Sequence, residues 1–357
     1  MLVSALNAFG FDEKESEVVP FGTGLINDTW KVTNHSGQYI LQRLNKTVFK
    51  QPHNIANNIS LVARHLAHHF PAYKFVAPVV SKTGEGLVSI NGDGYYRMFP
   101  FVKDSFCHDV VETTAQACEA AMQFGRFTRL LAGFNVSQLK ITIPSFHDLR
   151  MRYQQFLLSL QRGNLSRIET AKELIATLHQ HSDIVDEYVS IQQNPGFKPR
   201  VTHHDTKISN VLFDENDKGI CVIDLDTLMP GYFISDVGDM MRTYLCPVSE
   251  EESDFSKIEV RQEFYNAIVQ GYYTEMQEEL TTTEKGYFFY ASKFMMYMQA
   301  LRFLTDYLNN DVYYGEKYAG QNLIRAGNQA VLLQKLLEKE HVLSSIDLND
   351  NVVGSRV

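Results

Sequence analysis

The sequence predicts an α+β fold in two lobes, a small antiparallel sheet lobe followed by a larger, mainly helical lobe. The length of 357 residues exceeds what one hydrophobic core usually accommodates. Short apolar segments separated by turn residues fill the first hundred residues, whereas stretches with helical periodicity dominate after residue 110. We therefore expect a sheet lobe over 1–102, a helical lobe over 103–343 and a flexible tail over 344–357.

The first lobe contains one predicted hairpin, one predicted helix and three further strands. The hairpin joins 30–33 to 38–41 across a turn that contains Gly37. A helix is expected over 52–70, because apolar residues recur there at helical spacing and Pro52 suits a first turn. The further strands are expected at 74–80, 86–90 and 95–102.

The second lobe is expected to consist of helices and one small hairpin. Apolar residues at helical spacing predict the helices over 112–131, 145–160, 167–189, 261–277, 285–308 and 321–339. The hairpin joins 211–214 to 220–223, since two apolar runs flank the polar turn 215–219.

Charge is distributed unevenly along the chain. The segment 29–84 contains seven Lys or Arg and no Asp or Glu, although the net charge of the whole chain is −9. A basic first lobe indicates either an anionic ligand or a positive surface that docks on the acidic remainder, and composition does not decide between them. The negative total and the lack of a long apolar run predict no nucleic-acid or membrane partner and a cytoplasmic location. The oligomeric state is not indicated.

The densest group of chemically active side chains lies at 203–210, which reads H-H-D-T-K-I-S-N. Phosphoryl transfer needs a carboxylate near the attacking hydroxyl and positive charge near the transferred group. Asp205 is the candidate for the first role and Lys207 for the second, and both are expected to be catalytic.

An apolar strand that ends in two carboxylates follows this loop. The predicted hairpin returns the chain, so that Asn210 and Asp224 lie close together as oxygen ligands for Mg²⁺, with Asp226 as a further ligand. The order of glycine-containing loop, strand pair, helix, helical region, polar loop, hairpin and acidic strand end is typical of the protein-kinase-like phosphotransferase fold.

The candidate nucleotide-binding loop lies at 21–30, at the start of the predicted sheet. Glycines allow backbone N–H groups to approach phosphates closely. The residues expected to bind the nucleotide here are Gly22, Thr23, Gly24 and Asn27, of which Asn27 stands where the third glycine of G-x-G-x-x-G would be.

The strand lysine of a typical kinase is absent from this chain. Its position is occupied by Gln42 or Arg43, depending on strand register, and the following helix contains no Glu with which a lysine would pair. We therefore expect Gln42 or Arg43 to contact the nucleotide phosphates directly.

These motifs resemble those of the N-acetylhexosamine 1-kinases in the aminoglycoside phosphotransferase superfamily. The resemblance is carried by HHDTKISNVLFD at 203–214, VIDLDTLMPG at 222–231 and DVGDMMR at 236–242, and by GLINDTW at 24–30 and LQRLN at 41–45. It spans about residues 20–330.

The resemblance implies a sugar 1-kinase that uses ATP and Mg²⁺. Asp205 would be the general base on the anomeric hydroxyl, and Lys207 would contact the phosphoryl group or the sugar. Asn210 and Asp224 would bind Mg²⁺, with Asp226 a possible further ligand. The residues expected to support the catalytic loop are His203, Asp236 and Arg242.

The predicted sugar pocket includes Arg302, Asp306 and Tyr313. Arg302 and Asp306 are four residues apart on one face of an otherwise apolar helix, so that a hydroxyl-rich ligand or an internal salt bridge would satisfy them, and both readings stay open. Tyr313 lies in the following loop, where it would stack on a sugar ring or cover the core.

Three alternative functions compete with that of a sugar kinase. The superfamily also includes kinases of choline, homoserine and aminoglycosides, so the acceptor is less certain than the fold. A non-catalytic pseudokinase would explain the missing lysine, but the intact Asp205, Asn210 and Asp224 argue against it. A metal oxygenase would need a third histidine ligand, and after His204 only His341 remains.

Overall fold

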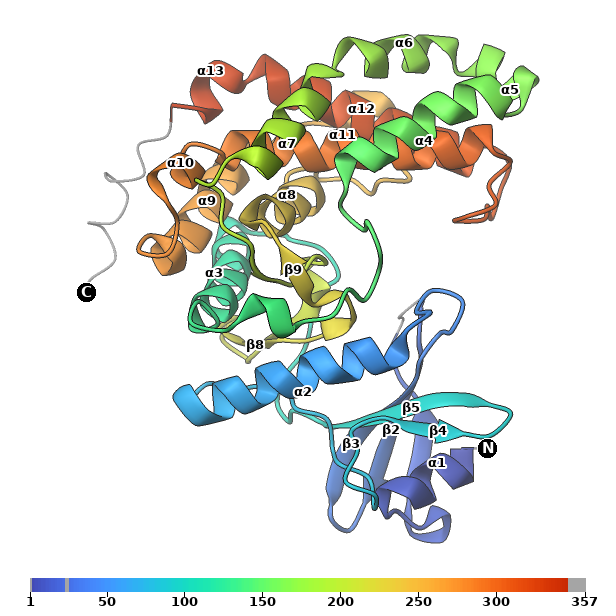
Figure 1. Cartoon of the computed structure of the whole chain (residues 1–357), viewed down its shortest axis with the longest axis vertical. Coiled ribbons are helices and arrows are strands. Elements are labelled where there is room, and N and C mark those ends of the chain that lie inside the picture. Colours follow the sequence, from blue (N-terminus) through green and yellow to red (C-terminus); the bar gives the residue numbers. More distant parts are fainter. Residues whose placement is uncertain (1, 23–25, 346–357) are drawn as a thin grey trace. The chain divides into compact units, whose positions relative to one another are not determined.

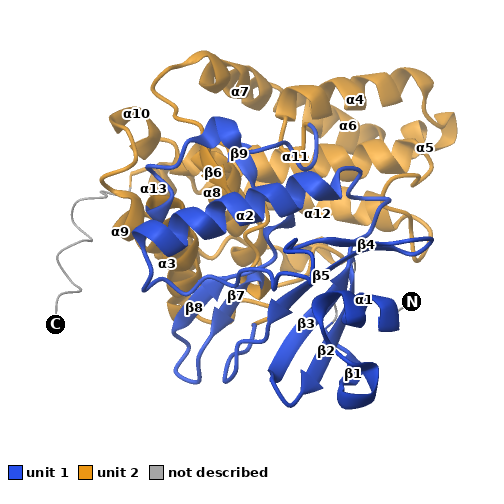
Figure 2. Cartoon of the chain, turned by 60° about the horizontal axis from the view of Figure 1, so that its bottom comes forward, with its two compact units in different colours: residues 1–107, 130–144, 210–230 blue, residues 108–129, 145–209, 231–357 orange. Residues whose placement is uncertain are grey.

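The computed structural model describes residues 2–22 and 26–345. The chain forms two compact units, each built from three separate segments (Figure 2). Unit 1 comprises 1–107, 130–144 and 210–230, and unit 2 comprises 108–129, 145–209 and 231–357. The sequence predicts consecutive lobes divided after residue 102, and that boundary stays a prediction.

Unit 1 contains a five-stranded antiparallel sheet with the order β1-β2-β3-β5-β4. Its strands are β1 (Glu17–Pro20), β2 (Asp28–Asn34), β3 (Gly37–Arg43), β4 (Val88–Ile90) and β5 (Gly94–Pro100). The register places Gln42 opposite both Thr29 in β2 and Arg97 in β5. The predicted sheet and its first hairpin are therefore confirmed.

The core of the sheet is closed by a helix that the sequence analysis does not predict. Helix α1 (Leu2–Phe9) packs its buried Ala5 and Leu6 against Val32, Leu41 and other apolar side chains of the sheet. Conversely, the strand expected at 74–80 is wrong. Val79 N–H donates to the Met98 carbonyl at 2.7 Å, but Pro78 has no N–H with which to extend a ladder.

Helix α2 (Pro52–His69) confirms the helix expected at 52–70 and connects distant parts of unit 1. Its buried Asn58 donates to the carbonyl oxygens of Lys140 (2.7 Å) and Leu228 (2.8 Å) and accepts the Lys140 N–H. One amide side chain thus fastens the helix to two later segments of the chain.

The second predicted hairpin is also confirmed and belongs to unit 1. Strands β7 (Val211–Phe213) and β8 (Gly219–Val222) pair antiparallel, with Val211 opposite Val222. The carbonyl of Asn210 accepts the N–H of Ile223 at 2.9 Å, so the ladder continues to the residue that precedes Asp224. The backbone at Asn210 therefore lies beside the Asp224 segment, as the sequence predicts.

Unit 2 is mainly helical and is organised around α11, whose side chains are buried nearly all round. Helix α11 packs against α4, α7, α8 and α12 (Figure 1). The helices are α3 (Thr114–Leu130), α4 (Leu149–Arg162), α5 (Leu165–Thr170), α6 (Lys172–Gln180), α7 (Asp183–Gln193), α8 (Phe233–Tyr244), α9 (Gln262–Met276), α10 (Thr282–Lys285), α11 (Phe288–Leu308), α12 (Gln321–Glu338) and α13 (Glu340–Leu343).

Two local features of this region differ from the sequence prediction. The single helix expected at 167–189 is three helices, because the backbone leaves helical geometry at Ala171 (φ −95°, ψ 8°) and at His181 (φ −101°, ψ 22°). Helix α8 is not predicted, and it carries residues of the candidate site. Its Gly238 allows close packing, since a Cβ there would lie 2.4 Å from the Ala291 carbonyl oxygen.

The remaining elements are short. They are the strands β6 (Arg200–Thr202) and β9 (Met229–Gly231) and the 3₁₀ helices Glu13–Glu15, Val136–Gln138, Ile208–Asn210, Leu225–Thr227 and Phe255–Lys257. Among residues 2–22 and 26–345, no helix has the combined length and hydropathy that crossing a bilayer requires.

Candidate active site

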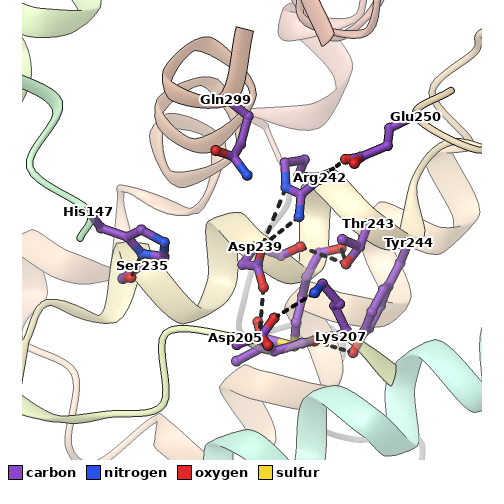
Figure 3. A network of polar contacts seen from close by, with 12 residues as sticks. His147, Asp205, Lys207, Ser235, Asp239, Arg242, Thr243, Tyr244, Glu250 and Gln299 are labelled. Carbon is purple, nitrogen blue, oxygen red and sulfur yellow. Dashed lines mark hydrogen bonds and ion pairs between the residues drawn. The ribbon is translucent and has the colours of Figure 1, made fainter. Parts of the chain in front are cut away.

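The candidate catalytic loop, residues 203–207 of unit 2, follows β6 and carries Asp205 and Lys207 as an ion pair. Lys207 Nζ lies 3.2 Å from Asp205 Oδ1 (Figure 3). The Asp205 carboxylate raises the pKa of Lys207, so that the ammonium is kept charged. The Lys207 side chain is 51% exposed and that of Asp205 24%, and a ligand therefore has access to both.

The backbone of this loop is held by two carboxylates of α8. Asp236 accepts the N–H groups of His203 (3.1 Å) and His204 (2.7 Å), and Asp239 accepts the N–H of Thr206 (2.8 Å). Burial raises the pKa of Asp236 to about 7, and the two N–H donors oppose that shift. Because both flanks of Asp205 are fixed in this way, its carboxylate is carried on a restrained backbone.

Arg242 connects this support to the following segment. Its guanidinium donates to Asp239 Oδ1 (3.1 and 3.3 Å) and to Glu250 Oε2 (2.8 Å), as Figure 3 shows. Glu250 also accepts from Arg325. The buried Asp239 is therefore charge-compensated while it holds the loop.

A serine on α8 joins two histidines next to the catalytic loop. Ser235 Oγ makes hydrogen bonds with Nδ1 of His204 (2.7 Å) and with Nδ1 of His147. The His204 backbone has a left-handed φ of +67°. Gly231 provides the space for its ring, since a Cβ there would lie 2.4 Å from His204 Cε1.

The candidate metal ligands lie in unit 1. Asn210 and Asp224 are placed by the β7–β8 hairpin, and Asp224 adopts a left-handed φ of +58° directly after Ile223. An amide oxygen and a carboxylate suit a hard divalent cation such as Mg²⁺.

Asp226 has a different environment from the one that the sequence suggests. One of its oxygens accepts from Arg97, and the other accepts from Asn27 Nδ2 at 2.8 Å. Both carboxylate oxygens of Asp226 therefore have protein donors, and its role as a metal ligand stays a prediction.

The nucleotide-loop residues are only partly within the described chain. Gly22 has φ +78° and Asn27 accepts the Asn45 N–H at 3.0 Å, whereas Thr23 and Gly24 lie outside the described residues. Asn27 thus connects this loop to the segment that follows β3.

Both candidates for the position of the missing strand lysine have hydrogen-bond partners within unit 1, and their contact with the nucleotide stays a prediction. Gln42 Oε1 accepts two N–H groups of Arg97 (3.0 and 2.8 Å). Arg43 donates to Asp28 (2.5 and 2.8 Å) and Asp93 (2.9 Å). The cation in the Gln42 register is therefore Arg97, which no motif indicates and only the pairing of β3 with β5 reveals.

The expected acceptor residues are placed in unit 2, but Arg302 and Asp306 do not pair with each other in the described structure. Asp306 accepts the N–H groups of Tyr313 (2.7 Å) and Tyr314 (2.8 Å) and so fixes the loop after α11. The internal salt bridge that the sequence leaves open is thus not formed. The side chain of Tyr313 is exposed.

Arg302 is 9% exposed and lacks a carboxylate partner within the described chain. It donates to Gln299 at 2.9 Å, and its guanidinium carbon lies 5.4 Å from the ring centre of Phe146 and 5.6 Å from that of Tyr314. Sequence reasoning missed a second cation nearby, Arg152, because it lies on a different helix. Burial and the charge of Arg302 lower the pKa of Arg152 to about 10.

His147 links this cationic group to the catalytic loop. Burial lowers its pKa well below the ordinary value, and the nearby His204, Arg302 and Arg152 contribute further. His147 is therefore neutral, which is compatible with its hydrogen bond to Ser235.

The five-stranded antiparallel sheet of unit 1 and the mainly helical unit 2 are the two parts expected of a kinase-like phosphotransferase fold. The sequence profile of the phosphotransferase enzyme family (APH) matches residues 17–278, and the chain belongs to this family.

Solved structures share the fold at low sequence identity. An amicoumacin kinase, solved with AMP-PNP, Ca²⁺ and its ligand, is 14% identical with a TM-score of 0.65, and the match covers 98% of this chain and 95% of that one. A microcompartment-associated aminopropanol kinase is 16% identical with a TM-score of 0.59, covering 97% and 98%. A choline kinase from Cryptosporidium parvum is 12% identical with a TM-score of 0.56, covering 95% and 96%. The predicted kinase-like fold is thereby confirmed.

Proposed function

We propose that this phosphotransferase is a small-molecule kinase that transfers the γ-phosphoryl group of ATP to the anomeric hydroxyl of an N-acetylhexosamine, giving the sugar 1-phosphate. The observation that carries the proposal is the Asp205–Lys207 pair on a loop whose backbone N–H groups are bound by α8 carboxylates. Family membership and the resemblance at 203–242 support it.

The residues of this chain have distinct tasks in such a reaction. Asp205 accepts the proton of the attacking hydroxyl as the new oxygen–phosphorus bond forms and the bond from the γ-phosphorus to the β–γ bridging oxygen breaks. Lys207 offers positive charge to the transferred group. Asn210 and Asp224 are the residues that would hold Mg²⁺, which supplies charge compensation for the phosphates. Nucleotide in the amicoumacin kinase structure is consistent with ATP as donor.

The charge around Arg302 supports a neutral acceptor over a cationic one. Arg302 is buried without a carboxylate partner in the described structure, and Arg152 lies close enough to be affected by its charge. Choline carries a permanent positive charge and aminopropanol is protonated at neutral pH, so both would be repelled there. The buried hydroxyl of Tyr314 and the Nε of Arg152 lack partners among the described residues, and an amide or hydroxyl of a sugar would satisfy them.

The proposal is tested by ADP release with ATP and Mg²⁺ against a panel of acceptors. The panel contains N-acetylglucosamine, N-acetylgalactosamine, glucose, choline, homoserine and an aminoglycoside. Turnover confined to the acetylhexosamines, with an anomeric phosphate in the phosphorus NMR spectrum, is expected. Asp205→Asn should lower kcat by about 10²- to 10⁴-fold while AMP-PNP still binds.

Two results would contradict the proposal at different levels. Turnover only on choline, homoserine or the aminoglycoside would keep the phosphotransferase and replace the acceptor. Nucleotide binding without turnover on any acceptor would favour the pseudokinase. Exposed Asp186 on α7 provides a matched control, since Asp186→Asn changes the same charge away from the loop.

A further inference from the structure

Arg97 is a buried cation in the middle of the unit 1 sheet. It is 3% exposed, and its partner Asp226 is 2% exposed. Burial of such a pair costs desolvation free energy, which only complete hydrogen bonding offsets. A guanidinium retained at this position therefore requires an explanation beyond the general stability of the sheet.

The guanidinium nitrogens of Arg97 donate hydrogen bonds to two different elements. Nε and Nη2 donate to Gln42 Oε1 at 3.0 and 2.8 Å, and Nη1 donates to Asp226. Gln42 is itself held, because its Nε2 donates to Thr29 Oγ1 at 3.3 Å. The planar guanidinium thus connects β2 and β3 to the segment after β8, which a lysine with a single nitrogen would do less well.

Asp226 extends this connection to the nucleotide loop and to the metal ligand. Asn27 donates to its second oxygen and also accepts the Asn45 N–H, so the segment after the glycines is fixed as well. Asp224 lies two residues before Asp226 and has the left-handed φ of +58°. A carboxylate held at Asp226 restrains the short segment that must present Asp224.

We propose that Arg97 is a positioning residue for the metal-bound nucleotide, acting through Asp226 to hold Asp224 in place. It supplies a fixed positive charge from β5, the strand that pairs with β3, and this charge contacts Gln42 and Asp226. The inference rests on the proposed use of ATP and Mg²⁺ and is independent of the acceptor.

The readout is the Mg²⁺-dependent gain in nucleotide affinity. Titration calorimetry gives the Kd of AMP-PNP with excess Mg²⁺ and in EDTA, and the ratio of the two measures how well the metal is positioned. Removing a group that orients a metal ligand typically lowers metal affinity about 10- to 100-fold. For Arg97→Met we therefore expect the ratio to fall at least about tenfold, whereas the Kd in EDTA changes less.

A second variant separates positioning from stability. Arg97→Met alone leaves Asp226 as an uncompensated buried charge and can lower stability strongly, whereas removing both charges is often neutral. The double variant Arg97→Met/Asp226→Asn should therefore melt closer to the wild type and still show the reduced ratio. Arg97→Lys keeps the charge but cannot bind Gln42 and Asp226 together, and we expect an intermediate loss of about threefold. Exposed Arg64 on α2 gives the control Arg64→Met, which should keep the wild-type ratio.

The outcomes are distinguishable. A folded double variant with the wild-type ratio overturns the inference, because the pair then serves stability alone. If neither Met variant folds, Arg97→Lys decides: a reduced ratio supports positioning and an unchanged ratio overturns it. If the wild-type protein binds AMP-PNP equally well with and without Mg²⁺, the ATP-dependent function itself fails, and this inference fails with it. If no acceptor of the panel is phosphorylated, the Kd of AMP-PNP with and without Mg²⁺ can still be compared, and the inference is still tested.

Discussion

Lys207 and Asp205 form a pair whose members are expected to do different chemical work. The Lys207 ammonium lies 3.2 Å from the Asp205 carboxylate, and its side chain is half exposed. It can therefore move from the carboxylate to a bound phosphoryl group while staying accessible to solvent. We expect Lys207→Met to lower kcat by about 10²-fold, as is usual for loss of one electrostatic donor at a transition state. Steady-state ADP release measures this, and exposed Lys172 supplies the control Lys172→Met. An unchanged kcat would remove Lys207 from catalysis.

Arg302 is the residue on which acceptor choice is expected to depend. A hydrogen bond from a charged group typically contributes about 1.5–3 kcal/mol. Arg302→Met should accordingly raise the KM for the acetylhexosamine by at least tenfold and leave the KM for ATP unchanged. Arg162→Met, at the exposed end of α4, is the control. An unaltered acceptor KM would exclude Arg302 from the sugar pocket.

His147 gives the protein a pH dependence with a definite sign. Its pKa is lowered in the folded state, chiefly by burial, so the unfolded chain binds the proton more tightly. Folded-state stability should therefore fall as pH decreases through about 6.5, the ordinary histidine pKa. Urea unfolding at pH 7.5, 6.5 and 5.5 should show a smaller decrease for His147→Asn, whose amide occupies the position of Nδ1. His341→Asn, at an exposed site, should keep the wild-type slope; equal slopes for all three proteins would refute the prediction.

At the scale of elements, α8 is the support of the catalytic loop. Its Asp236 and Asp239 bind three loop N–H groups, and its Gly238 faces α11 with no room for a side chain. The apolar residues of 233–244 recur at helical spacing, so the sequence contains a signal for α8 that the prediction leaves out. What periodicity does not indicate is that the buried polar residues of this helix bind a neighbouring loop.

The packing of α8 predicts a stability effect. In Gly238→Ala, the new Cβ would lie 2.4 Å from the Ala291 carbonyl oxygen and 2.9 Å from Met295 Cβ, so α8 must shift. Overpacking of this kind costs about 1–3 kcal/mol, although alanine is otherwise the better helix former. Urea denaturation should show the loss, together with a reduced kcat because the loop moves with α8. Gly133→Ala, with open space around its Cβ, should be nearly neutral; equal stability of the two variants would count against this packing.

At the scale of the whole molecule, the sequence predicts the class of fold, whereas the contacts between distant segments of the chain are not predicted. The hairpins at 28–43 and 211–222 follow from alternation and turn residues, which are local signals. Arg97 is not predicted because its importance depends on a hydrogen bond with Gln42, which is 55 residues away in the sequence. The two hydrogen-bond donors to the Asp226 carboxylate, Arg97 and Asn27, are also distant in the sequence. Hydrophobic periodicity reports local structure, so it does not predict contacts between residues that are far apart in the sequence.

The three-segment composition of unit 1 predicts how fragments behave. A fragment of residues 1–107 contains the sheet but lacks 130–144 and 210–230. We expect it to be unfolded or aggregated, because the apolar face of α2 and its buried Asn58 lose partners there. Circular dichroism and gel filtration measure this. A soluble fragment with cooperative unfolding would instead support the boundary near residue 102.

The interleaving of the units also has a consequence for synthesis on the ribosome. Helix α2 is complete once residue 69 has been added, but the carbonyl groups that Asn58 binds belong to residues 140 and 228. At the usual elongation rates of about 5–20 residues per second, the second acceptor is added about 8 to 32 seconds after the helix is complete. During this interval the nascent chain presents an amphipathic helix without its final partners, which is the kind of surface that chaperones recognise.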